Sequence, residues 1–335
     1  MAKKDSEGRP SISLVTPTAA IAGGEIQIKG KGFCKAERPQ VTIGDVVAPV
    51  IVGSDSFVIA RVPEGASAGE VVIGDGEHSS QTWVCDIGIP IASNLHPVAN
   101  PVVDKFGNVY STFSGSRGQK VPVAVYKIDL NYEMKPFLTD VMNATGMTFD
   151  AAGMLYVSSR FDGIVYRASP SGNMSIFVEG MGVATGLAFD DEENLYVGDR
   201  SGTIFKISSS RQIFVFATLE PSIAAFHLTY GPDRNLYVSG PTTSSFDSIH
   251  RITPSGEVEL FYRGLGRPQG MAFDHRNRLH VAASLGGRKG VVRFGDNRKP
   301  ELFLSGPGIV GLAFSASDAL VLATTNALYR VQLSH

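Results

Sequence analysis

From about residue 90 the chain alternates short apolar runs with clusters of turn-forming residues. The segment TGLAFDDEENLYVGDRSGTIFKI, which begins at Thr185, contains three such runs separated by Asp, Asn, Gly and Ser. Short runs with alternating polarity are typical of β-strands, whereas an amphipathic helix needs apolar residues three or four positions apart. The pattern therefore predicts strands and turns rather than helices over this region.

The strand pattern repeats at an interval of about 41 residues. One aromatic position recurs in steps of 40, 41, 43 and 41, at Phe149, Phe189, Tyr230, Phe273 and Phe314. A basic and an aromatic position recur together in steps of 40, 39, 45 and 42, at Lys127, Arg167, Lys206, Arg251 and Arg293 and at Phe137, Phe177, Phe216, Phe261 and Phe303. Two positions whose spacings lengthen and shorten in the same units mark true repeats. Four strands in such a unit is the size of a β-propeller blade.

Six units fill residues 89–335, because 335 − 89 = 246 and 246 divided by 6 is 41. The last unit ends at ALYRVQLSH without a fourth strand, and an exposed strand edge promotes aggregation. We therefore expect the segment WVCDIGIPIA, which begins at Trp83, to supply the missing outer strand and close the ring. The pattern leaves open whether Trp83 to Asp86 belong to the preceding domain.

Residues 10–88 do not fit the repeat. About seven short strands separated by Gly, Pro and Asp turns predict a small β-sandwich there. The charged and polar residues 1–9 predict a flexible N-terminus. The fold class expected for the chain is thus all-β, a small immunoglobulin-like β-sandwich followed by a six-bladed β-propeller at residues 89–335.

The order of features in the sandwich resembles the IPT/TIG immunoglobulin-like family. These features are Pro17 after the first strand, glycines at Gly30 and Gly32, the segment VTIGDVVAPV and the turn at Pro63. Domains of that family serve mostly as spacers or association modules. The resemblance therefore implies a role in positioning the propeller or in forming a homo-oligomer through the sandwich.

The propeller resembles the NHL-repeat and gluconolactonase-like group. The matching strings are Gly186 to Asp190 and Asn194 to Asp199. Members of the group include lactone hydrolases with a divalent metal in the central channel, lyases and binding proteins. The resemblance identifies the blade type well and the activity poorly, because one fold hosts many functions.

Charge and composition limit the classes of partner that the protein is expected to bind. Thirty Lys and Arg against 32 Asp and Glu give a formal charge of −2, which argues against nucleic acid as a partner. No apolar run is long enough to cross a membrane, and no secretory signal follows the N-terminus, so we expect a cytoplasmic protein without membrane contact. The two cysteines, Cys34 and Cys85, predict either two thiols or one disulfide.

Several repeated polar residues are interpreted as structural. Asp150, Asp190 and Asp274 follow the first strand of their blades, where an Asp side chain accepts hydrogen bonds from a turn. The repeated basic residues, with Arg330 as the sixth, are expected to lie along the neighbouring blade and to form local salt bridges rather than an anion-binding ring. The glycines before the first strands allow close packing at the axis.

The function is expected at the mouth of the axial channel, where residues just before the first strands and just after the second strands meet. His227 is the candidate catalytic residue, as a general acid or base near neutral pH, or else a hydrogen-bonded part of the channel wall. Arg160 and Arg200 are expected to clamp a carboxylate or phosphate, or to pair with Asp162 or Asp199. The remaining candidate substrate-binding residues are Thr145, Thr185, Ser239, Gln269 and Thr324.

A metal site is a weaker candidate at this mouth. In the metal-dependent lactonases that the propeller resembles, a Glu, two Asn and an Asp hold the ion. Here Asn143 and Asp199 could serve as oxygen ligands for calcium, zinc or manganese, and no Glu stands at any predicted mouth position. The predicted cofactors are accordingly none, or one divalent metal.

Two functions of different classes remain open. The first is a gluconolactonase-like hydrolase or lyase that acts on a small anionic or lactone substrate at the channel mouth. The second is a non-catalytic recognition module, in which the propeller presents its face to a protein or a glycan. Catalysis requires several groups to converge on one point, whereas recognition needs a broad surface with aromatic or arginine anchors.

Overall fold

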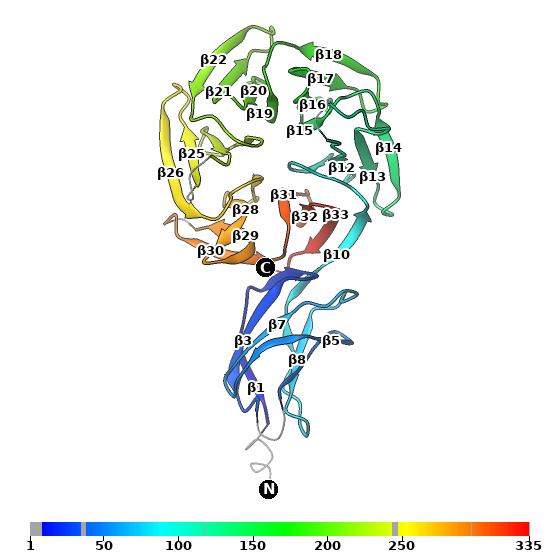
Figure 1. Cartoon of the computed structure of the whole chain (residues 1–335), viewed down its shortest axis with the longest axis vertical. Helices are drawn as coiled ribbons and strands as arrows, with labels where there is room; N and C mark the ends of the chain where they lie inside the picture. Colours follow the sequence, from blue (N-terminus) through cyan, green and yellow to red (C-terminus); the bar gives the residue numbers. More distant parts are fainter. Residues whose placement is uncertain (1–8, 35–37, 117, 243–246, 296, 335) are drawn as a thin grey trace.

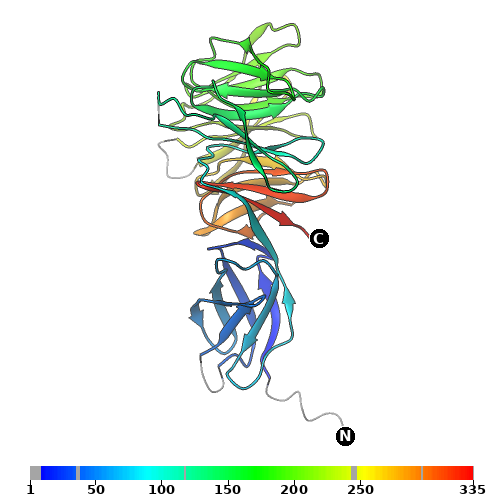
Figure 2. The same cartoon turned by 90° about the vertical axis from the view of Figure 1, so that its right-hand side faces the viewer.

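The computed structural model describes residues 9–34, 38–116, 118–242, 247–295 and 297–334. The ring of blades and the elongated N-terminal domain beneath it are seen face-on in Figure 1 and edge-on in Figure 2. The chain is all-β, as predicted, with no helix in the described residues. The predicted flexible N-terminus falls outside the described residues except for Arg9.

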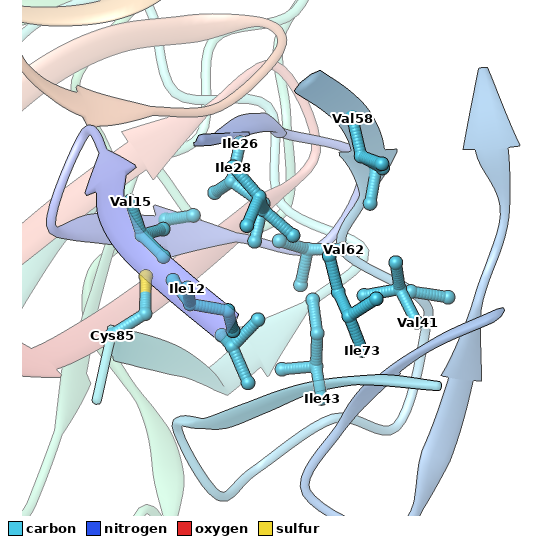
Figure 3. Packing of buried hydrophobic residues seen from close by; sticks show 14 of the residues in the cluster. Ile12, Val15, Ile26, Ile28, Val41, Ile43, Val58, Val62, Ile73 and Cys85 are labelled. Carbon is cyan, nitrogen blue, oxygen red and sulfur yellow. The ribbon is translucent and has the colours of Figure 1, made fainter. Parts of the chain in front are cut away.

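The N-terminal domain is a sandwich of two four-stranded sheets. Their strand orders are β1(Ser11–Thr16)-β3(Glu25–Lys31)-β7(Phe57–Arg61)-β6(Val50–Gly53) and β5(Val46–Ala48)-β4(Gln40–Ile43)-β8(Glu70–Gly74)-β9(Trp83–Val84). Alternate residues of these strands point between the sheets, so Ile26, Ile28, Ile43 and Ile73 are fully buried in one core (Figure 3). The predicted sandwich is confirmed.

Six four-stranded blades form the propeller, each running from an inner to an outer strand. Blade 1 consists of β11(Val102–Val103), β12(Val109–Thr112), β13(Val125–Ile128) and β14(Met134–Leu138). Blade 2 consists of β15(Ala144–Phe149), β16(Leu155–Ser159), β17(Ile164–Ala168) and β18(Met174–Val178). Blade 3 consists of β19(Ala184–Phe189), β20(Leu195–Asp199), β21(Thr203–Ile207) and β22(Ile213–Thr218). Blades 4 and 5 are β23(His227–Tyr230), β24(Leu236–Ser239), β25(Asp247–Ile252), β26(Val258–Leu265); and β27(Met271–Phe273), β28(Leu279–Leu285), β29(Arg288–Phe294), β30(Pro300–Ser305). Blade 6 consists of β31(Ile309–Phe314), β32(Ala319–Thr324), β33(Ala327–Gln332) and β10(Asp86–Ser93).

The repeated aromatic residues form the packing between blades. In blade 2 the Tyr156 ring meets Phe177 of its own blade and Phe189 of the next edge-to-face, with ring centroids 4.9 Å apart in both pairs. The Tyr156 hydroxyl donates to the carboxylate of Asp150, which also accepts the backbone N–H of Met154 in the turn. The same arrangement recurs around the ring, which confirms the turn-capping role predicted for Asp150, Asp190 and Asp274.

Four of the six repeated basic residues, Arg167, Lys206, Arg251 and Arg293, form the expected local salt bridges. Arg167 lies 3.9 Å from Asp150, Lys206 lies 3.5 Å from Asp190, and Arg293 pairs with Glu301. Each cation and its partner belong to one blade. The set is therefore distributed over the blade surfaces and does not surround the axis.

The ring is closed by the predicted segment. Strand β10 pairs antiparallel with β33, with Ile89 opposite Arg330 and Ser93 opposite Ala327. The N-terminal side of the same segment belongs to the sandwich, since Trp83 and Val84 form β9. Residues from before the first blade thus complete the last blade, and no strand edge is left unpaired between them.

The sandwich also contributes a strand to the propeller, which the repeat pattern did not predict. Strand β2(Ala19–Ile21) lies between the outer strand of blade 5, β30, and the first half of β10, and it pairs parallel with both. Blades 5 and 6 and β2 therefore form one nine-stranded sheet. Arg288 of blade 5 adds hydrogen bonds from its guanidinium to the backbone oxygens of Thr16 and Glu25. The two domains are joined by a continuous sheet rather than by a linker.

The cysteines do not form a disulfide. Cys34 is exposed and Cys85 is buried in the sandwich core, and both are free thiols. Burial raises the pKa of Cys85 to about 12. No helix long and apolar enough to span a membrane occurs in the described part of the chain.

Candidate functional site

A pocket of 320 Å³ opens at one end of the propeller axis. Five of the blades contribute the residue at or near the start of their inner strand, and the sixth contribution comes from the segment that joins β10 to blade 1. We call it the axial pocket. Its lining includes His96, Thr145, Arg160, Thr185, Arg200, Ile223, His227, Arg267, Gln269, Val310 and Thr325.

Glycines next to these residues allow the inner strands to converge. A Cβ atom on Gly146 would lie 2.1 Å from the backbone oxygen of Thr185, and one on Gly186 would lie 2.6 Å from that of Phe226. Neighbouring inner strands therefore pack closely only because no side chain stands between them. This packing brings Thr145, Thr185 and His227 of three successive blades to one pocket.

The floor of the pocket is closed. The segment at Ala99 and Asn100 packs against blades 5 and 6, where the Asn100 amide donates to Met271 O and accepts from the N–H of Leu312. A void of 20 Å³ lies beneath, and His227 borders both this void and the axial pocket. A further pocket of 410 Å³ follows at the opposite end of the inner strands. A ligand that binds in the axial pocket could therefore contact His227.

His227 is 5% exposed at the first position of β23. Burial lowers the pKa of its imidazole to about 4, because the charged form would be transferred out of water. The ring is therefore neutral at neutral pH. Of the two interpretations of His227, an acid–base group requires this neutral ring to face a ligand, and its place at the pocket floor meets that requirement.

Arg160 and Arg200 both line the pocket, as the sequence suggested. Arg160 donates from Nη2 to Gly115 O at 3.3 Å. Arg200 donates to the backbone oxygens of Ser222 at 3.5 Å and Ile223 at 3.1 Å, rather than to the carboxylate of Asp199. These bonds to backbone oxygens hold two guanidinium groups at the pocket.

Four of the candidate binding hydroxyls are engaged in backbone hydrogen bonds. Thr145 donates to Asn143 O, and Thr185 donates to Gly198 O while it accepts from Phe226 N–H, although both line the pocket. Ser239 donates to Gln269 O at 2.6 Å and Thr324 to Ala327 O at 3.0 Å. Ser239 and Thr324 are not lining residues. Gln269 does line the pocket and is half-buried.

The candidate metal ligands Asn143 and Asp199 hold backbone segments. The Asn143 amide accepts from Gly118 N–H at 2.8 Å and donates to the oxygens of Gly115 and Ser116 at 3.0 Å. The Asp199 carboxylate accepts from Val183 N–H at 2.7 Å and from the Ser201 hydroxyl. Their oxygens are thus occupied, and neither residue lines the axial pocket. Within the described residues no three His, Cys, Asp or Glu side chains are grouped as metal ligands.

Among the lining residues that sequence reasoning missed are His96, Ile223 and Arg267. His96 bonds through Nδ1 to Ser114 O at 2.8 Å, Ile223 is 56% exposed, and Arg267 adds a third guanidinium. All three lie between strands, outside the repeated positions. With Arg267 included, the lining carries three arginines, and no Asp or Glu is present among the lining residues that the structure describes.

Comparison with known proteins supports both parts of the architecture. Residues 10–88 match the family model of the IPT/TIG domain. No curated protein sequence matches the chain. The solved structures that resemble it share little sequence and therefore indicate the fold alone.

Three of these structures illustrate the range of functions. An auxiliary nutrient binding protein from Bacteroides ovatus has a TM-score of 0.55 at 12% identity, covering 97% of this chain and 98% of its own. A virginiamycin B lyase from Staphylococcus aureus has a TM-score of 0.53 at 13% identity, covering 99% and 98%. A protein named as a candidate gluconolactonase has a TM-score of 0.59 at 14% identity, covering 74% and 92%. The chain therefore combines an IPT/TIG domain with a six-bladed propeller of the NHL and gluconolactonase-like fold.

Proposed function

We propose that the propeller binds a small anionic molecule in the axial pocket. The observation that carries this proposal is the charge of the lining, since Arg160, Arg200 and Arg267 contribute three guanidinium groups and no described lining residue contributes a carboxylate. Guanidinium groups bind carboxylates and phosphates through paired hydrogen bonds. A pocket of 320 Å³ is at the small end of the range for ligand sites, which favours a small molecule over a polymer.

Calorimetric titration with inorganic phosphate, citrate and gluconate tests this proposal. We expect saturable binding of at least one anion, and Arg267→Ala should raise its dissociation constant about tenfold, because one charged hydrogen-bond donor is lost. Arg267 is exposed, so the change should leave folding intact. The control is Arg276→Ala, which removes an exposed arginine in the turn after β27, at the far end of that strand from the pocket. Equal weakening by the two variants, or no anion binding at all, would contradict the proposal.

A second candidate function is turnover of the bound molecule, as in a hydrolase or lyase. The specific observation that favours it is the neutral His227 at the pocket floor, which could take a proton from a bound substrate or from water. Asn143 and Asp199 do not line the axial pocket, and their side chains hold neighbouring backbone segments. This candidate is therefore metal-independent acid–base chemistry by His227.

A panel of lactones and esters separates an enzyme from a non-catalytic recognition module. Under the enzyme proposal, His227→Gln should remove most turnover and leave anion affinity nearly unchanged, since the three arginines remain. Turnover at the wild-type level in that variant would rule out His227 as the acid or base. Elemental mass spectrometry of the purified protein tests the metal-dependent alternative directly, and one equivalent of calcium, zinc or manganese would overturn the metal-independent proposal.

A further inference from the structure

Another cavity, of 410 Å³, lies between blades 1 and 2. Inner strand β15 runs from the axial pocket, at Thr145, to this cavity, at Phe149, so the two lie at opposite ends of the strand. We call it the blade 1–2 cleft. Its walls carry four aromatic side chains and two carboxylates, those of Phe106, Tyr110, Phe137, Phe149, Asp104 and Asp150.

The repeat provides equivalent positions with which to compare this cleft. Phe137 is one of five repeated phenylalanines on the outer strands, and in the other four blades a cation of this chain lies over the ring. These pairs are Arg211 over Phe177 at 5.1 Å, Lys206 over Phe216 at 5.8 Å, Arg298 over Phe261 at 5.2 Å and Arg293 over Phe303 at 4.6 Å.

No cation from the described residues lies over Phe137 in this way. Lys127, the basic residue of blade 1, lies 5.5 Å from the centre of the Tyr110 ring instead. Two packing arrangements thus supply a positive charge to the phenylalanine face in four blades, and neither does so for Phe137 among the described residues.

In two of these pairs the cation comes from a turn of the following blade, and in the other two it comes from the third strand of the same blade. A glycine at the turn position, as at Gly256 beside Phe216, therefore leaves the ring uncovered only where the strand cation lies elsewhere. Arg211 and Arg298 occupy the left-handed position of the turn before an outer strand, with φ of 65° and 57°. Gly172 occupies the same position in blade 2, with φ of 86° and the same turn hydrogen bond to the residue three before it. A Cβ atom there would lie 3.9 Å from the Phe137 ring, so a side chain at Gly172 would extend over that ring.

A second, independent difference concerns the repeated Asp. In blades 2 to 5 this carboxylate has an Arg or Lys nitrogen within 4.0 Å, at Asp150, Asp190, Asp233 and Asp274. For Asp104 of blade 1 no Lys, Arg or His nitrogen of the described chain lies that close. Asp104 accepts hydrogen bonds from Asn108 and Tyr110 and lines the blade 1–2 cleft, as does Lys105.

Phe106 gives the cleft an additional aromatic wall. In blades 2 and 3 the corresponding turn residue is Ala152 or Glu192, whereas Phe106 is 68% exposed, with Lys105 on its ring at 5.3 Å. Its exposed ring adds apolar surface at the rim of the cleft.

We propose that the blade 1–2 cleft binds the guanidinium group of a ligand, which takes the place that Arg211 and Arg298 occupy over the phenylalanine of the preceding blade. A planar guanidinium stacks on aromatic faces more readily than an ammonium group, and the charge of Asp104 attracts it. The ligand class is thus a small guanidinium compound or an arginine-containing peptide.

Calorimetric titration of the full chain with agmatine and with the peptide acetyl-Gly-Arg-Gly-amide tests the proposal. The expected result is saturable binding of at least one of these probes, with acetyl-Gly-Lys-Gly-amide at least about fivefold weaker than its arginine counterpart. Agmatine binding would identify a free guanidinium as sufficient, and binding of the peptide alone would identify a polypeptide ligand. No saturable binding of either probe, or equal binding of the lysine and arginine peptides, would overturn it.

Two variants connect the binding to the cleft. Gly172→Arg supplies the chain's own guanidinium and should abolish binding, since Arg211 and Arg298 show that arginine is tolerated at this turn position. Phe106→Ala removes an exposed ring and should weaken binding about tenfold without unfolding the protein. The matched control is Phe214→Ala, which removes another exposed ring, on β22. Binding unchanged in Phe106→Ala, or weakened equally by the control, would refute the assignment even if Gly172→Arg did not fold.

Discussion

The strand exchanged between the domains makes a prediction about stability. Ile21 belongs to the N-terminal domain by sequence, but it is 1% exposed and packs in the same core cluster as Leu304 of blade 5. Ile21→Ala removes roughly three carbons at about 0.8 kcal/mol each and leaves a cavity, so we expect a loss of about 3 to 4 kcal/mol in the free energy of unfolding. That loss should fall on the propeller as well as on the sandwich, because β2 is a strand of the nine-stranded sheet.

The single tryptophan makes the two domains separately observable. Trp83 lies in β9 and packs partly buried against the sandwich core, so its fluorescence reports on that domain. Far-UV circular dichroism is dominated by the strands of the propeller. In urea, the two signals of the wild-type protein should change together, and Ile21→Ala should shift both midpoints equally.

Ile43→Ala provides the matched control. Ile43 is fully buried in the sandwich core and has no place in the shared sheet. If the domains unfold as one unit, this variant also shifts both signals. The reasoning would be refuted if the tryptophan signal moved alone in both variants, because the sandwich would then unfold independently of the propeller.

Three further results are expected. The pKa of His227 is about 4 in the folded protein and about 6.5 in the unfolded chain, so the unfolded chain binds more protons between these pH values and stability is lost as the pH falls through them. At pH 5 the loss in the free energy of unfolding is roughly 2 kcal/mol. The urea midpoints at pH 7 and pH 5 should therefore differ less in His227→Gln than in the wild-type protein. Asn143→Ala removes the hydrogen bonds to Gly115, Ser116 and Gly118 and should cost about 2 to 3 kcal/mol, with faster amide hydrogen exchange at Gly118. Unchanged exchange would contradict this. Ellman's reagent should modify Cys34 alone in the folded protein and Cys85 only after denaturation, and rapid reaction of two thiols would contradict the burial of Cys85.

The repeat made most of the fold predictable. Residues of the blade cores recur because each blade packs on the next in the same way, so Phe149, Phe189 and their equivalents set the register from sequence alone. The closing strand followed from counting strands, since a ring with one blade of three strands needs a fourth from elsewhere.

The strand β2 was not predictable for physical reasons. Ala19–Ile21 has three residues, too few to show an alternating pattern. Its partners in β30 and β10 are parallel and, for β30, lie about 285 residues away in the chain, so no turn or spacing signals the pairing. Such contacts are determined by the assembled tertiary structure rather than by local sequence.

The candidate site was predictable in position but less so in chemistry. The repeat located the inner-strand entrances and hence Thr145, Thr185, His227 and Gln269. It did not reveal that the side-chain amide of Asn143 is hydrogen-bonded to a neighbouring loop, because that loop has no counterpart in the other repeat units. The loop residues that complete the axial pocket have no repeated position and gave no signal.

Some residues that depart from the repeat keep its packing contacts, whereas others lose a contact that other blades make. His280 stands where Tyr156, Tyr196 and Tyr237 stand in other blades, but it packs edge-to-face on Phe303 and Phe314 at the same 4.9 Å, and burial keeps its pKa low. It therefore substitutes for a core tyrosine. Gly172 instead lacks the side chain with which Arg211 and Arg298 cover a phenylalanine ring, and Lys127 does not cover Phe137 either, so the aromatic rings of the blade 1–2 cleft stay open to a ligand.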